Sequence, residues 1–126
     1  MKLDFESNTT TPIITEYSDK GIVIANQNLN TPFIACGEEL QIDVLPGEVS
    51  ELNEQIIEAI MANDVDIIIL GTGSEQTFPD AAITLPALQR GVGVEVMETG
   101  AACRSYNVLV SEGRKVAGIF YPLGNR

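Results

Sequence analysis

The chain has 126 residues, 44% of them hydrophobic, which is enough for one domain with a single core. Its formal net charge is −11, and the stretch from Gly21 to Gln89 holds eleven acidic residues but no lysine or arginine, which excludes nucleic acids and anionic lipid surfaces as partners. The absence of histidine excludes Ser-His-Asp and Cys-His catalysis and every histidine-containing metal site. We also expect no bound metal and no cofactor.

We expect a single domain over residues 1–126, in which the polar residues 1–12 form a loose N-terminal arm. No apolar run is long enough for a membrane span, and residues 1–6 lack the apolar region of a signal peptide. Cys36 and Cys103 make no CxxC motif, and two reduced thiols are typical of a reducing compartment. These features predict a cytoplasmic location.

The first half of the chain predicts antiparallel strands. Residues 13–17 and 22–25 read as strands and flank a turn cluster, which indicates a hairpin, and residues 26–30 are expected to form a short turn. Residues 31–36 predict a strand with Pro32 at its start, and residues 40–44 alternate apolar and polar side chains, as in a half-buried strand.

From residue 50 onward, helical and extended patterns alternate. Leu52, Ile56, Ala59 and Ile60 recur at helical spacing, with Ser50 as the expected N-cap. Residues 66–70 predict a strand that is hydrophobic on both faces after Asp66, as in a central parallel strand.

Three further elements complete the chain. A second helix is expected over residues 80–90, where Pro86 should kink or restart it, and a strand over 92–97. A third helix is expected over 100–112, with Thr99 as its cap and Ala102, Tyr106 and Leu109 as its core stripe, followed by a strand over 116–121. The order helix, strand, helix, strand, helix, strand predicts an α/β fold: a three-layer sandwich with a mixed, mainly parallel central sheet, helices packed on it and an antiparallel N-terminal strand region.

The candidate binding site lies where two of these strands end. Gly71-Thr72-Gly73 ends one strand and Thr99 begins the helix after the next, so both should lie at the same edge of the sheet, where open α/β sheets bind ligands. Glycines there would let backbone N–H groups approach an anion. Gln76 occupies the place of the third Rossmann glycine, and a simple strand-ending turn remains the alternative.

Arg104 and Asn107, three residues apart, share one face of the third helix and extend this candidate site. Arg104 would anchor an anion or, alternatively, pair with Glu95 or Glu98. Cys103 lies near the helix start beside Arg104, which lowers a thiol pKa, but a buried cysteine in the core is the other interpretation.

Residues 68–73 (IILGTG), 91–97 (GVGVEVM) and 101–107 (AACRSYN) resemble a small bacterial and archaeal family of uncharacterised domains related to mitochondrial NADH dehydrogenase (complex I) assembly factor 3. The chain differs from the usual family pattern at Ser105, where threonine is common, and at Pro86, in a helix that usually has no proline. The resemblance implies a compact α/β fold with a mixed sheet, and no catalytic residues to carry over. The mitochondrial relatives act as assembly factors bound to partner proteins.

Two functions follow as hypotheses. The first is a non-enzymatic module that binds or assembles a protein partner. The second is a protein or enzyme that binds a small anionic metabolite at the edge formed by the Gly71-Thr72-Gly73 turn and the helix starting at Thr99, with Arg104 and Asn107 beside it. We favour the first, because the sequence contains no complete catalytic pattern.

Overall fold

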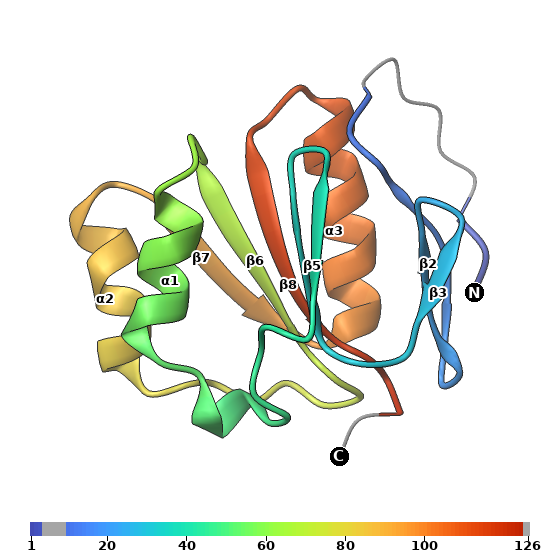
Figure 1. Ribbon diagram of the computed structural model, residues 1–126, viewed down its shortest axis with the longest axis horizontal. Coiled ribbons are helices and arrows are strands. Elements are labelled where there is room, and N and C mark those ends of the chain that lie inside the picture. Colours follow the sequence, from blue (N-terminus) through green and yellow to red (C-terminus); the bar gives the residue numbers. More distant parts are fainter. Residues whose placement is uncertain (4–9, 125–126) are drawn as a thin grey trace.

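The chain folds around one five-stranded sheet and one three-stranded sheet, as a computed structural model that describes residues 1–3 and 10–124 shows (Figure 1). The strand order of the larger sheet is β5-β4-β8-β6-β7. β6 pairs in parallel with β7 and β8, whereas β4 pairs antiparallel with β8 and β5. The strands of this mixed sheet are β4 (Phe33–Cys36), β5 (Glu39–Ile42), β6 (Ile67–Thr72), β7 (Gly93–Met97) and β8 (Val116–Tyr121).

Helices cover both faces of this sheet. α1 (Glu54–Met61) and α2 (Ala81–Gln89) lie on one side and α3 (Thr99–Ser111) on the other (Figure 1). Every residue of β6 and of β8 is buried, so their side chains alternate between two apolar clusters, one under α3 and one under α1 and α2. The predicted α/β class with a mixed central sheet is therefore confirmed.

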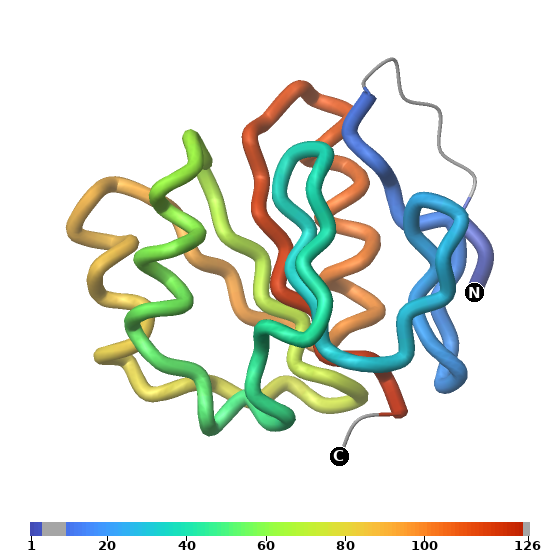
Figure 2. The backbone as a smooth tube through the Cα atoms, viewed as in Figure 1, coloured from blue at the N-terminus to red at the C-terminus, as the bar shows by residue number. Residues whose placement is uncertain are grey.

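The N-terminal strands form their own antiparallel sheet, which packs against α3 on the side away from the larger sheet (Figure 2). It consists of β1 (Ile14–Ser18), β2 (Gly21–Ile24) and β3 (Gln27–Leu29). The predicted hairpin is confirmed, but the turn expected over residues 26–30 is wrong. Ala25 and Asn26 both have positive φ and make the turn, and Gln27 pairs with Ile24.

Residues 1–3, expected as part of a loose arm, run beside β1. The Leu3 N–H donates to the Thr15 carbonyl over 2.9 Å, and the Tyr17 N–H donates to the Met1 carbonyl over 2.8 Å. These bonds extend the small sheet by one short bridge between Lys2 and Glu16. Residues 4–9, also placed in the expected arm, lie outside the described residues.

The start of α1 differs from the sequence-based expectation. Asn53 is the N-cap, and its side-chain oxygen accepts a hydrogen bond from the Ile56 N–H over 3.1 Å. Ser50, the expected cap, lies in a short 3-10 helix, η1 (Val49–Glu51). Val49 and Leu52 are both buried, and they anchor η1 against the sheet, which delays the start of α1.

α2 and α3 correct two further expectations. α2 continues through Pro86 without restarting. The cap of α3 is Glu98 and not Thr99, because the Glu98 carboxylate accepts hydrogen bonds from the N–H groups of Gly100 and Ala101. Thr99 is instead the first residue of the helix and is fully buried.

The expected core stripe of α3 is present, with Ala102 and Tyr106 fully buried and Leu109 partly buried against the same cluster. Among the described residues, no helix has the length and apolar character needed to cross a membrane.

Candidate functional site

The end of β6 and the start of α3 lie side by side, as the alternating pattern predicts. The Thr99 N–H donates to the Gly73 carbonyl over 2.8 Å, and the Gly73 N–H donates to the Thr99 hydroxyl over 2.7 Å. That hydroxyl in turn donates to the Tyr121 carbonyl at the end of β8 over 2.5 Å. Thr99 thus holds three chain segments together, and its polar groups are engaged inside the protein.

Gly71 and Thr72 point to opposite faces of the sheet. Gly71 lies against α3, where a Cβ would come within 2.9 Å of the Ala102 Cβ, so only glycine lets the helix approach so closely. Thr72 lies on the side of η1 and lines a cavity of about 340 Å³ together with Glu48 and Glu75. Gly73 and Thr99 therefore share one corner with Gly71 and Thr72, but of the six predicted site residues only Thr72 lines this cavity.

The cavity beside Thr72 is acidic. It is lined by residues that include Glu48 and Glu75, and no described lining residue is a lysine or arginine. The Thr72 hydroxyl donates to the Glu75 carbonyl over 2.6 Å and accepts from the Thr77 N–H over 3.0 Å, so it shapes the loop. An anion placed here would meet two carboxylates. Anion binding at this edge stays a prediction without support from the charges of the cavity.

Arg104 forms an ion pair with Glu98, which is one of the two alternatives predicted from the sequence. Its Nη2 lies 3.8 Å from Glu98 Oε1, and its Nη1 donates a hydrogen bond to the Tyr17 hydroxyl. Both side chains of the ion pair are more than a third exposed, so their attraction adds little to stability. Arg104 connects the start of α3 to β1, on the opposite side of the sheet from the Thr72 cavity.

Asn107 is buried and bonded on both sides of its carboxamide. Its Oδ1 accepts from the Ile14 N–H over 2.8 Å, and its Nδ2 donates to the Ile14 carbonyl over 2.7 Å. The side chain therefore pairs with β1 as a neighbouring strand would. Like Thr99, it presents no free polar group at the surface of the described structure.

Cys103 is fully buried under the small sheet. Burial, and to a lesser extent the charge of Glu98, raise the pKa of its thiol to about 12, although Arg104 and the backbone act in the opposite direction. The sequence-based argument that Arg104 lowers this pKa is correct in sign, but burial outweighs it. Burial and the charge of Glu39 also raise the pKa of the half-buried Cys36.

We expect the two thiols to react with iodoacetamide at very different rates in the folded protein. Burial raises the pKa of the Cys103 thiol to about 12, so very little of it is ionised at pH 8, and its side chain is fully buried. Mass spectrometry of the native protein at pH 8 should find Cys36 modified first, and both thiols modified in urea. Equal labelling of Cys103 and Cys36 under native conditions would contradict this account.

A different surface stands out once the structure is known: the outer side of α2. Ala87 is the one buried residue of this helix, yet most of its residues are apolar. Leu85 is 49% exposed and Leu88 54% exposed, and with the exposed Ala81 they follow the spacing i, i+4, i+7 of one helix face. Phe78, three residues before the helix, is 70% exposed. We call Phe78, Ala81, Leu85 and Leu88 the α2 surface.

The α2 surface is not among the residues predicted from the sequence, although the sequence contains a signal for it. Apolar residues fall on several sides of residues 81–88, a pattern that belongs to a helix buried all round. In the structure Ile83 packs on the cluster under α1 and α2, while Leu85 and Leu88 face outward. A pattern typical of a buried helix therefore occurs on a helix with an open side.

Comparison with known protein families shows to which family the chain belongs. Residues 14–121 match the family described as protein of unknown function DUF498/DUF598. The chain belongs to this family. The match spans β1 to β8, so it covers both sheets and all three helices of the described structure.

Three relatives show what this DUF498/DUF598 chain resembles. The 13 kDa major membrane protein of Francisella tularensis subsp. holarctica is 28% identical over 90% of this chain and 94% of its own length. NADH dehydrogenase (ubiquinone) 1 alpha subcomplex assembly factor 3 of Danio rerio is 30% identical over 87% of this chain, which spans 64% of that relative's length. The solved structure of Xanthomonas campestris XCC1710 superposes with a TM-score of 0.81 and 32% identity, covering 100% of this chain and 96% of that protein. Kinship to the assembly factor is thus confirmed.

Proposed function

We propose that the chain is a protein-binding module of the assembly type, and that its partner docks on the α2 surface. The observation that carries the proposal is an apolar helix whose outer side is open: Leu85 and Leu88 are about half exposed on a helix of the kind normally buried on all sides. The relative named as an assembly factor supports a role in protein association.

The charges around the α2 surface indicate the kind of partner. Glu75 and Asp80 flank Phe78 in the chain, and Arg90 at the end of α2 is held by Glu58 over 3.0 Å. With a net charge of −11, a second copy of this chain would be repelled. The partner expected here is therefore a protein segment with apolar residues bordered by lysine or arginine.

A pair of substitutions tests the proposal. In Leu85→Lys/Leu88→Lys the apolar contact is lost and positive charge faces a basic partner, while helix propensity is retained. Val108→Lys is the matched control, because Val108 on α3 is 46% exposed, close to Leu85. Loss of one well-packed leucine contact is worth about 2 kcal/mol, or roughly 30-fold in affinity.

The unmodified chain, the double variant and Val108→Lys are each tagged and expressed in cells. Quantitative mass spectrometry then compares the proteins that co-purify with each tagged form. We expect a basic protein that the unmodified chain and Val108→Lys retain equally and that the double variant loses at least about tenfold. High salt should weaken its retention. Equal retention of the partner by all three forms would refute the proposal. It would also be refuted if the unmodified chain binds a second copy of itself and the double substitution abolishes that self-association.

A further inference from the structure

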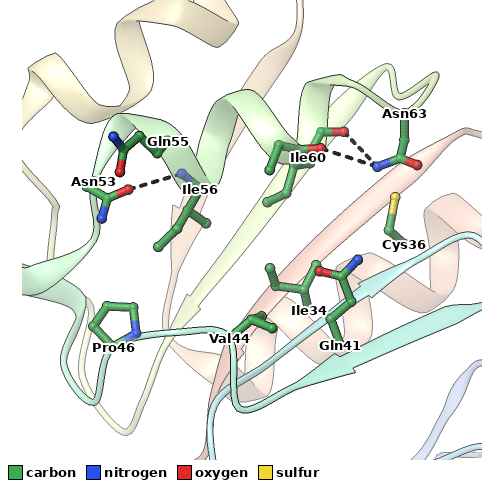
Figure 3. Close-up of a pocket in the computed structure, with 11 residues that line it drawn as sticks. Ile34, Cys36, Gln41, Val44, Pro46, Asn53, Gln55, Ile56, Ile60 and Asn63 are labelled. Carbon is green, nitrogen blue, oxygen red and sulfur yellow. Dashed lines mark hydrogen bonds between the residues drawn. The ribbon is translucent and has the colours of Figure 1, made fainter.

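A groove lies between α1 and the hairpin formed by β4 and β5, on a different part of the molecule from the α2 surface (Figure 3). Its volume is about 330 Å³, within the range of small-molecule sites. Ile34 from β4 and Ile60 from α1 form its buried apolar floor. Ile56 and Ala59, two of the apolar residues that recur at helical spacing in α1, both line this groove; Ile56 is partly buried against the core, whereas Ala59 is exposed.

The groove carries no charge. None of its eleven described lining residues is acidic or basic, although the stretch from Gly21 to Gln89 that supplies all of them holds eleven acids. Cys36 lies at one end, and burial and the nearby Glu39 raise its pKa, so the thiol is neutral at pH 7. A charged ligand would lose its hydration in this groove without forming an ion pair with a lining residue.

Four carboxamides surround the apolar floor: Gln41, Asn53, Gln55 and Asn63. Asn53 uses its oxygen to cap α1, which leaves its NH₂ group, and Asn63 uses its NH₂ group on carbonyls of α1, which leaves its oxygen. The side-chain carboxamides of Gln41 and Gln55 make no hydrogen bond to any described residue, although the backbone of Gln41 pairs with β4. The rim therefore offers both donors and acceptors to a ligand.

From these observations we infer that the groove binds a small, uncharged organic molecule with an apolar body and a polar edge of amide type, such as a heteroaromatic ring or an aliphatic amide. The apolar body would lie on Ile34, Ile56 and Ile60, and the polar edge would bond to the rim carboxamides. The inference does not rest on the α2 surface.

Three probes of one size but different charge test this inference: benzamide, benzoate and benzylammonium. Each is titrated into ¹⁵N-labelled protein while backbone and side-chain NH₂ signals are followed by NMR. Benzamide should shift the backbone signals of Ile56 and Ala59 and the Gln41 NH₂ signal, saturating with a dissociation constant on the order of 1 mM. Benzoate and benzylammonium should bind there at least about tenfold more weakly.

Ala59→Trp fills the groove and should abolish the benzamide shifts. Ala62→Trp is the control, because Ala62 is an exposed residue at the end of the same helix outside the groove lining, and it should bind benzamide like the unmodified chain. The inference fails if benzoate or benzylammonium binds as tightly as benzamide. It also fails if benzamide gives no saturable shift up to its solubility limit, or if both tryptophan variants lower binding equally.

Discussion

Replacing Asn107 by leucine is expected to lower the free energy of unfolding by about 4 kcal/mol, the largest effect we anticipate for a single substitution. Leucine has a similar volume, but it leaves the Ile14 N–H and carbonyl without their partners at 2.8 and 2.7 Å. Ile14 is fully buried, so water does not replace the lost bonds. Each buried unpaired group costs about 1–3 kcal/mol.

Thermal and urea unfolding measure the effect. A loss of this size corresponds to a fall in melting temperature of about 15 °C for a domain of this length. Val108→Ala, at the neighbouring exposed position, should change stability by no more than about 0.5 kcal/mol. A melting temperature for Asn107→Leu within a few degrees of the unmodified protein would show that β1 does not depend on this carboxamide.

Thr99→Val is expected to cost about 3 kcal/mol, because valine keeps the shape of threonine and removes its hydroxyl. The Gly73 N–H and the Tyr121 carbonyl, bonded at 2.7 and 2.5 Å, both lose their partner in a buried position. Thr99→Ser keeps the hydroxyl and loses a single methyl group, so it should cost about 1 kcal/mol.

The comparison of the two Thr99 variants separates hydrogen bonding from packing. Hydrogen exchange should also be faster at Gly73 in Thr99→Val than in Thr99→Ser, because the end of β6 is released. If the valine variant is as stable as the serine variant, the hydroxyl does not hold this corner together. The corner would then be available for another role.

The alternation of helices and strands from residue 50 onward could be predicted because β6 and β8 are buried on both faces and are therefore mostly apolar. The pairing of β4 with β8 could not, because the register Phe33 with Phe120 joins residues far apart in the chain. β3 could not be predicted either, because Leu29 is its one buried residue, so its sequence shows no alternation of apolar and polar side chains.

The candidate site illustrates a different limit. Threonine is a preferred N-cap residue and glutamate is not, yet Glu98 caps α3, because Gly73 and Tyr121 engage the Thr99 hydroxyl. Similarly, Arg104 donates a hydrogen bond to the Tyr17 hydroxyl because β1 places Tyr17 beside α3. The sequence predicted that the two βα junctions meet, but the faces to which their side chains point are set by tertiary contacts.

The α2 surface is the central claim of the functional account, and photo-crosslinking in cells tests it most directly. A photoreactive benzoyl-phenylalanine is introduced at position 88 in one form and at position 108 in another, since both sites are exposed to a similar extent. The account predicts that position 88 forms a crosslink to a single basic protein and that position 108 does not. Crosslinks to that protein from position 108 alone, or equal yields from both positions, would contradict it.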